Sequence, residues 1–370
     1  MPRSADVVVI GGGVIGCAAA LELAKAGLSV TVVERGTPGC EASGAAAGML
    51  TPQAEASASS PFLTLALRSQ ALYPDLAVEL REETGVDIEL QTGGNLCCFL
   101  DEGDEAVGRA AFSWQREAGL KAELLSREDV LRLEPALSPE ILGALFLAGD
   151  QWVNNVRLVA ALAQAAAIRG VEFFSREATG LTVDRGQAVG ARVGQEVLRA
   201  GAILLAAGAW SGRLAAASGL TLPVEPVRGQ ILSLPATPRK LHHLLHVKEH
   251  YLVPRVGGEI LVGASMEGVG FSKQVTAGSV RALLDSAIRL VPETARLPLA
   301  ATWAGFRPGT PDEQPILGLY PGVEGLYVAT GHFRNGILLA PITARLMREL
   351  IVDGAPSLDL APFLPDRFLK

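Results

Sequence analysis

"VVVIGGGVIGCAAALELAKAGLSVTVVERG", residues 7–36, is the stretch that decides the fold. It contains a β-branched run, a glycine-rich segment that fits G-x-G-x-x-G, an Ala- and Leu-rich segment, and a second β-branched run that ends at Glu34. A β-branched run without polar interruption is typical of a strand buried on both faces of a sheet. The order predicts a strand over 7–10, a turn, a helix to about Ala26 that ends at Gly27, and a strand over 29–33.

The same stretch has the composition of a membrane segment, and this alternative fails on its details. Glu22 and Lys25 interrupt the run before it reaches the about 18–20 apolar residues that a span needs. A signal peptide would need an uninterrupted apolar stretch, whereas three glycines lie in the middle of this one. We therefore expect a protein without a membrane segment.

Composition limits the class of protein further. The chain has 370 residues, which is long enough for two domains with substantial cores. Its formal charge of -7, from 32 basic and 39 acidic residues, argues against a nucleic-acid partner. The four cysteines lack metal-ligand spacing, and the histidines within 242–250 lack an accompanying Cys or Asp cluster. We expect reduced thiols, no metal ion and a cytoplasmic location.

The glycine-rich segment predicts a dinucleotide site. Gly11 permits the tight turn, Gly13 lets the backbone approach a pyrophosphate, and Gly16 lets the helix pack closely on the strand. The helix N-terminus offers N–H groups and a positive dipole to the phosphates. Glu34 is placed to accept hydrogen bonds from ribose hydroxyls, and an acid at this position disfavours a 2′-phosphate. FAD and NAD both remain at this point.

Two further stretches favour FAD. "SGAAAGML", residues 43–50, is a run of small residues whose backbone can lie alongside a long cofactor. "GLYVATGHFRNGILLAPITARLMREL", residues 325–350, predicts a strand over 326–329, a turn, and a helix from about Gly336. The N-terminus of that helix would stabilise the negative charge of a reduced isoalloxazine. An ordinary strand–helix connection is the alternative for this stretch.

Taken together, the motifs resemble those of the D-amino-acid oxidase superfamily of FAD-dependent oxidoreductases, and within it the bacterial glycine oxidases of thiamine biosynthesis. The resemblance covers almost the whole chain, and the last two motifs at their spacing are the specific ones. "GGGVIG" alone would fit many flavoproteins. The motifs are "VVIGGGVIG", "SGAAAGML", "AAGAWSG", "PVRGQILSL", "YLVPR", "LVGASM", "WAGFRPGTPD" and "GHFRNGILLAP".

The resemblance implies an α/β fold with a Rossmann-like FAD-binding domain and an interleaved substrate-binding domain built on an antiparallel sheet. The FAD-binding domain would comprise residues 1–90, 151–224 and 325–370. The substrate-binding domain would comprise residues 91–150 and 225–324. The strand-like pattern over 227–266, with Gly257-Gly258 as a hairpin signal, fits this expectation. The family also suggests a homo-oligomer, specifically a tetramer.

The resemblance implies a set of cofactor-binding positions as well. FAD should be bound non-covalently, because the cysteine that carries the flavin in sarcosine oxidases is missing before "TPDE". The expected cofactor-binding residues are Gly11, Gly13, Val14, Ile15, Gly16, Glu34, Arg35, Ala42, Ser43, Ala47, Gly48, Met49, Ala178, Gly208, His332, Phe333, Arg334, Asn335, Gly336, Ile337 and Leu338.

Substrate-binding positions follow from the same resemblance. Arg307 matches the family's carboxylate-binding arginine, a residue type suited to bidentate binding. Arg334 matches a second arginine, and Tyr251 matches a pocket tyrosine. Met266 and Met49 match apolar pocket positions. The alternatives are a surface salt bridge for Arg307, a core position for Tyr251 and gap-filling for the methionines. Glu249 stands where the family pattern carries a histidine, which leaves the substrate range open.

The activity implied is oxidation of glycine, and of sarcosine or small D-amino acids, by hydride transfer from the α-carbon to flavin N5. No protein general base is expected, so no catalytic residue is assigned. The imine product hydrolyses to a keto acid and ammonia, and O2 reoxidises the flavin to give H2O2. Two rival hypotheses are a D-amino-acid dehydrogenase with another electron acceptor and a non-catalytic nucleotide-binding protein.

Overall fold

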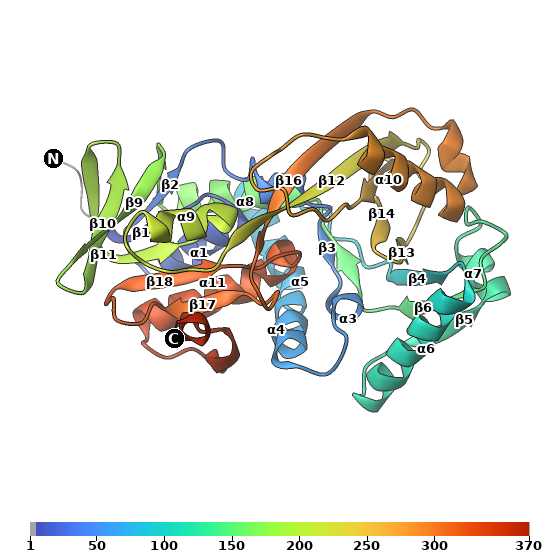
Figure 1. Cartoon of the computed structure of the whole chain (residues 1–370), viewed down its shortest axis with the longest axis horizontal. Helices are drawn as coiled ribbons and strands as arrows, with labels where there is room; N and C mark the ends of the chain where they lie inside the picture. The colour runs from blue at the N-terminus through green and yellow to red at the C-terminus, as the bar shows by residue number, and fades with distance from the viewer. Residues whose placement is uncertain (1–4, 370) are drawn as a thin grey trace.

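The computed structural model describes residues 5–369 and contains two eight-stranded sheets at opposite ends of an elongated molecule (Figure 1). The first sheet has the order β17-β18-β11-β1-β2-β8, and the β9–β10 hairpin extends it beside β11. Its strands are β1 (Ala5–Ile10), β2 (Val30–Glu34), β8 (Glu172–Ser175), β9 (Ala178–Asp184), β10 (Gln187–Val193), β11 (Glu196–Leu205), β17 (Ile316–Leu319) and β18 (Leu326–Thr330).

β1 lies at the centre of this sheet, in parallel register with β2 on one side and β11 on the other. Val7 and Val9 pack into the core formed with helices α1, α8 and α11. Val8 and Ile10 pack on the opposite face, in the core shared with β9, β10 and α9. The predicted strand, turn, helix and strand are therefore confirmed, and burial of both faces explains why the run has no polar interruption.

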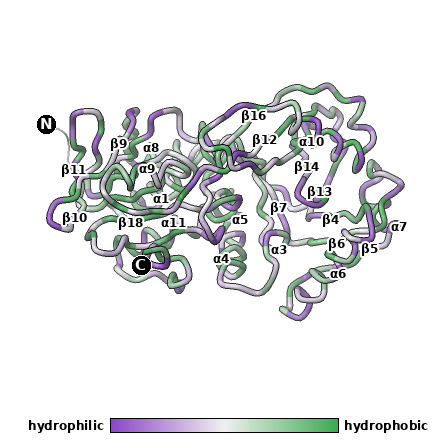
Figure 2. Tube along the Cα trace, viewed as in Figure 1, coloured by the Kyte–Doolittle hydropathy of each residue, from purple (hydrophilic) through white to green (hydrophobic). Residues whose placement is uncertain are grey.

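Helices α1, α8 and α11 pack on the first sheet, and α10 packs on the second sheet. In Figure 2 hydrophobic positions follow the strands and the helices packed against them, and hydrophilic stretches occur in outer loops near β10 and α7. The helices are α1 (Val14–Lys25), α2 (Ala42–Ala45), α3 (Pro52–Glu55), α4 (Pro61–Gln70), α5 (Tyr73–Thr84), α6 (Glu102–Glu117), α7 (Arg127–Leu133), α8 (Asn155–Ile168), α9 (Ser211–Ala216), α10 (Ala277–Leu290) and α11 (Gly336–Val352).

α11 contains Pro341 in its first half, and the side chains of two neighbouring helices compensate for it. Proline has no N–H, so the carbonyl four residues earlier loses its usual donor. The Tyr73 hydroxyl of α5 donates to that carbonyl, which belongs to Ile337. The Ser69 hydroxyl of α4 donates to Leu338 O at 2.6 Å. These bonds hold the N-terminal turn of α11 in place between the first sheet and α4.

The second sheet has the order β16-β12-β15-β14-β13-β4-β6-β5, and every pairing in it is antiparallel except β13 with β4. One face packs on α10 through residues such as Leu232, Val262 and Leu283. The opposite face turns toward the first half of the molecule. Its strands are β4 (Asn95–Phe99), β5 (Glu123–Ser126), β6 (Gly143–Leu147), β12 (Glu225–Pro235), β13 (Leu244–Val247), β14 (His250–Pro254), β15 (Glu259–Gly263) and β16 (Ala301–Gly309).

A short third sheet pairs β3 (Met49–Leu50) with β7 (Gln151–Trp152). The expected α/β fold class is confirmed by these elements and by the structural comparison given below. β17 joins the first sheet although it precedes residue 325, where the last FAD-binding segment was expected to start. The division into domains stays a prediction. Within residues 5–369, no helix combines the length and apolarity needed to cross a membrane.

Candidate functional site

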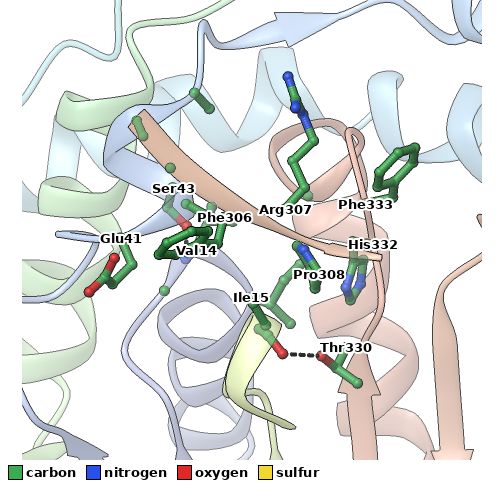
Figure 3. A pocket seen from close by; sticks show the side chains of 18 of the residues that line it. Val14, Ile15, Glu41, Ser43, Phe306, Arg307, Pro308, Thr330, His332 and Phe333 are labelled. Carbon is green, nitrogen blue, oxygen red and sulfur yellow. Dashed lines mark hydrogen bonds between the residues drawn. The ribbon is translucent and has the colours of Figure 1, made fainter. Parts of the chain in front are cut away.

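A cavity of about 690 Å³ lies between the two sheets, within the size range of small-molecule and cofactor sites. Its walls come from segments far apart in the sequence. Figure 3 shows Val14 and Ile15 of α1, Phe306–Pro308 of β16, and His332 and Phe333 of the turn before α11 around it. The cavity is continuous from the end of β2 to the inner face of the second sheet.

The glycine-rich turn forms the first end of the cavity, and its geometry requires glycine. Gly11 has a φ of +108°, and a Cβ there would lie 2.5 Å from Ala206 O. A Cβ on Gly16 would lie 1.9 Å from Gly11 O, so this glycine permits the close packing of α1 on the turn. α1 begins at Val14 without a side-chain cap from Gly13, and the Val14 N–H donates to Ser43 Oγ at 2.9 Å.

Glu34 is fixed at the cavity wall by backbone amides. Its Oε2 accepts a hydrogen bond from the Gly12 N–H at 2.7 Å, and its Oε1 accepts one from the Gly36 N–H at 2.8 Å. Each oxygen keeps a further lone-pair direction, because a carboxylate offers about four acceptor sites. The carboxylate is therefore oriented before any ligand binds.

An aromatic and cationic cluster adjoins this end of the cavity. The Arg35 guanidinium lies 4.2 Å from the ring centroid of Trp210. The Trp210 ring in turn packs against Phe271 and Phe306, with centroid separations of 5.0 and 6.0 Å. The Arg213 guanidinium lies over the Phe271 ring, 3.8 Å from its centroid. Such pairs stabilise the wall through cation–π and edge-to-face contacts.

The turn between β18 and α11 forms the middle of the cavity. Phe333 has a φ of +47°, and its N–H donates to Pro308 O at 3.1 Å, which ties the turn to β16. The His332 ring hydrogen-bonds Thr343 at 3.1 Å, and burial lowers the pKa of His332 to about 3, so the ring is neutral. The N-terminus of α11 at Gly336 opens on this wall without a side-chain cap.

The inner face of the second sheet forms the far end of the cavity, and glycines make room on it for two long side chains. A Cβ on Gly229 would lie 2.4 Å from Arg307 Nη1, and a Cβ on Gly263 would lie 2.6 Å from the Tyr251 hydroxyl. Both side chains therefore lie across neighbouring strands. The Arg307 Nη1 donates to Ser265 O at 3.0 Å, which aims the guanidinium.

Arg307 and Tyr251 also affect each other's titration. Burial lowers the pKa of Arg307, and the adjacent Tyr251 opposes this change. Burial raises the pKa of Tyr251, while Arg307 acts in the other direction through charge and a hydrogen bond. At neutral pH the pair presents a guanidinium and a neutral hydroxyl, which is a donor set suited to a carboxylate.

A second arginine lies at the mouth of this region. Arg334 Nη2 lies 3.0 Å from Glu55 Oε2, in an ion pair that is more exposed on the arginine side. Met49 and Met266 line the same cavity, and Met266 is 43% exposed. Glu249 lines it as well and is exposed. The five expected substrate-binding residues are thus brought to one cavity.

Most of the expected cofactor-binding residues also line the cavity, and three do not. Gly16 packs against Gly11, Asn335 is buried as the N-cap of α11, and Leu338 is buried in the core. The cavity-lining members are Gly11, Gly13, Val14, Ile15, Glu34, Arg35, Ala42, Ser43, Ala47, Gly48, Met49, Ala178, Gly208, His332, Phe333, Arg334, Gly336 and Ile337. Their contacts with the cofactor stay a prediction.

Sequence reasoning missed several wall residues. Glu55 and His246 lie on the wall beside Tyr251, and Gly229 and Gly263 shape the floor. Glu55 ends a one-turn helix that no periodicity signals. The two glycines lie within "PVRGQILSL" and "LVGASM", so a glycine inside a strand pattern was the available signal.

The residues present fit FAD. A dinucleotide turn with a fixed acid lies at one end of the cavity, and a helix N-terminus and a carboxylate-binding pair lie at the other. Cys40 is the one cysteine among the lining residues, and it lies near the end of β2 rather than beside Arg307. Within the described residues, no group of three or more His, Cys, Asp or Glu side chains is arranged to hold a metal ion.

Comparison with known proteins agrees with the geometry. Residues 6–350 match the family model described as "DAO: FAD dependent oxidoreductase". The chain is 42% identical to glycine oxidase of Geobacillus kaustophilus, over 98% of this chain and 97% of that protein. A crystal structure of glycine oxidase from Geobacillus kaustophilus superposes with a TM-score of 0.96 at 39% identity, covering 100% of both chains.

Two other relatives have different names. The bifunctional protein ThiO/ThiG of Trichormus variabilis is 39% identical over 99% of this chain and 55% of that protein. The hydrogen cyanide synthase subunit HcnC of Pseudomonas aeruginosa is 36% identical over 100% of this chain and 97% of that protein. Because the family model and these relatives match nearly the whole sequence, the chain belongs to the DAO family of FAD-dependent oxidoreductases, as a glycine oxidase-like enzyme with FAD as its cofactor.

Proposed function

We propose that this enzyme oxidises glycine to glyoxylate and ammonia, with O2 as the final electron acceptor and H2O2 as a product. The observation that carries the proposal is the half-buried Arg307 guanidinium, aimed by Ser265 and lying over Gly229 beside the Tyr251 hydroxyl. This donor set lies in the same cavity as the dinucleotide turn. The names of the relatives that match nearly the full chain support glycine as the substrate.

In this proposal Arg307 and Tyr251 bind the carboxylate of the substrate. The chemistry that bound FAD would supply is the uptake of a hydride from the α-carbon at N5. Two fixed contacts to the carboxylate restrict the orientation of a substrate as small as glycine, and orientation of this kind accounts for a large part of the rate. The substrate reacts with its amine unprotonated, and no protein group is assigned as a general base. Water then hydrolyses the released imine to glyoxylate and ammonia.

The size of the substrate pocket is set in part by Met49 and Met266. Both side chains are flexible, so the pocket can accept sarcosine or a small D-amino acid in addition to glycine. A role in forming the thiazole of thiamine is part of the proposal, and it is supported by the ThiO part of the bifunctional relatives. We also propose non-covalent FAD and a cytoplasmic homo-oligomer, the latter to be measured by light scattering.

The test is a visible absorption spectrum of the purified holoenzyme under anaerobic conditions, before and after glycine is added and again after air is admitted. Bleaching by glycine and recovery in air are expected. Bleaching without recovery would overturn the oxidase step and indicate a dehydrogenase with another acceptor. A flavin band that glycine leaves unchanged would overturn glycine as the substrate, and the same titration with sarcosine and D-alanine would then follow.

A further inference from the structure

Three polar side chains, two of them fully buried and the third half-buried, form a hydrogen-bonded chain that ends at the substrate wall, and the proposed reaction does not use them. Asp150 lies just before β7, Asn95 begins β4, and His246 lies on β13. Asn95 Nδ2 donates to Asp150 Oδ2 at 2.9 Å, and Asn95 Oδ1 lies 2.9 Å from His246 Nδ1. Asp150 and Asn95 are both 0% exposed.

The chemistry of the amide sets the direction of this chain. An amide NH₂ group only donates hydrogen bonds, and an amide oxygen only accepts them. With its NH₂ group on the Asp150 carboxyl, Asn95 presents its oxygen to the histidine. His246 must then carry its hydrogen on Nδ1, which leaves a lone pair on Nε2.

The His246 ring lies where the Nε2 lone pair can accept a hydrogen bond from a ligand in the cavity. His246 is the cross-strand partner of Tyr251 in the β13–β14 pair, and the two rings meet edge to face at 5.9 Å. The ring lines the cavity, and within residues 5–369 no protein group hydrogen-bonds Nε2. Burial, aided by the positive charge of Arg334, lowers the pKa of His246 to about 4, so the ring is neutral at physiological pH.

We propose that Asp150, acting through Asn95, holds His246 in the Nδ1–H tautomer so that its Nε2 accepts a hydrogen bond from the amine of the substrate. Asp150 and Asn95 are positioning residues, and His246 is a substrate-binding residue that recognises the amino group. This inference rests on the proposed function, because it takes the carboxylate of the same substrate to be bound by Arg307 and Tyr251. No proton is transferred in this step.

The tautomer can be measured without any substrate. The holoenzyme labelled with ¹⁵N-histidine gives separate NMR signals for protonated and unprotonated ring nitrogens, and His246→Asn assigns the signals of this residue. We expect a hydrogen on Nδ1 and none on Nε2. A hydrogen on Nε2 would overturn the proposal, because it would mean that a protonated Asp150 donates to a turned Asn95 amide.

Two Asp150 variants test the positioning role in the same experiment. Asp150→Leu removes the acceptor for Asn95 and should mix the two tautomers of His246. Asp150→Asn keeps a carbonyl acceptor and should restore the Nδ1–H form. If the leucine variant does not fold, the wild-type tautomer remains decisive, since a hydrogen on Nε2 there contradicts the assigned direction.

Recognition of the amine is tested by ligands with and without it. His246→Asn keeps a donor near Nδ1 and removes the Nε2 acceptor, whereas His246→Gln places an amide near Nε2. We expect His246→Asn to raise the glycine KM about 2- to 10-fold, the range for one neutral hydrogen bond. The Kd of acetate, read from the flavin spectrum, should not change, and His246→Gln should recover part of the glycine affinity.

An equal loss for glycine and acetate, or no loss for either, would overturn the role in amine recognition. Failure of the proposed function looks different. In that case the wild-type flavin is not reduced by glycine at all, while the NMR experiment still reports the tautomer of His246.

Discussion

Substituting Gly229 with alanine should displace Arg307 and leave the fold intact. A Cβ at this position would lie 2.4, 2.6 and 2.7 Å from Nη1, Cζ and Nη2 of the guanidinium. Ordinary contacts begin at 3.4 Å, so the guanidinium must move by about 1 Å from the place where it donates to Ser265 O. The obstacle is the end of a flexible side chain, so the free energy of unfolding should change by about 1 kcal/mol or less.

The effect on the substrate should be much larger than the effect on stability. A hydrogen bond to a charged group contributes about 1.5–3 kcal/mol, which corresponds to about 10- to 100-fold in affinity. We therefore expect Gly229→Ala to raise the glycine KM for anaerobic flavin reduction by that factor, measured by stopped-flow absorbance. The thermal midpoint, measured on the same preparation, should stay within a few degrees of wild type.

Gly257→Ala is the matched control, because it adds the same methyl group at a glycine with no atom within 4 Å of its Cβ position. The control should leave KM and stability unchanged. A wild-type KM in Gly229→Ala would refute the reasoning, since it would mean that the guanidinium position does not determine carboxylate binding. A large loss of stability with KM unchanged would locate the role of Gly229 in folding.

Three further predictions concern other groups. Tyr251→Phe removes one neutral hydrogen bond to the substrate and should raise the glycine KM about 2- to 10-fold, with a smaller change in kcat, in steady-state kinetics. An unchanged KM would indicate that Tyr251 has a packing role only. Burial, together with the charge of Glu55, raises the pKa of Asp150 to about 8, so the native state holds a proton that the unfolded state releases near pH 4. The free energy of unfolding of the wild type should therefore fall, relative to that of Asp150→Asn, as pH rises from about 4 to about 8. Urea unfolding at several pH values in this window measures both free energies. The same pH dependence in the two proteins would contradict the prediction. Cys40 is exposed and lines the cavity, so Ellman's reagent should label it in the apoprotein and label it more slowly once FAD is bound. Cys40→Ser serves as the reference that identifies the labelling of this thiol. Equal labelling rates in the two forms would mean that FAD does not bind beside Cys40.

The dinucleotide turn could be predicted from the sequence because its parts are local. Gly11, Gly16 and Glu34 belong to one strand–helix–strand unit, and each residue type answers a nearby steric or charge requirement. The same reasoning assigned Glu34 to a ribose and did not predict the two backbone amides that hold it. Those bonds depend on how the chain turns after β2, which composition alone does not specify.

The far end of the cavity could be predicted only through resemblance. His246 and Asn95 are 151 positions apart, and Asn95 and Asp150 are 55 apart. The contact of His246 with Asn95 follows from the parallel pairing of β13 with β4, an exception in an otherwise antiparallel sheet. The contact of Asn95 with Asp150 follows from the antiparallel pairing of β4 with β6. No motif or spacing in the sequence indicated that His246, one of the histidines within 242–250, lies in a hydrogen-bonded chain with Asn95 and Asp150.

The wall of the cavity begins at Ile10 and ends at Ile337. During synthesis the ribosome must therefore release nearly the entire polypeptide before the cofactor has a complete place to bind. Until then the first sheet is incomplete, because β1 pairs with β11 and β11 pairs with β18, and both strands come later in the chain. FAD uptake can stabilise only the finished fold, by mass action on the native state. A C-terminal truncation before α11 would remove Gly336 and Ile337 from the cavity wall, so the shortened chain should purify without the yellow colour of FAD.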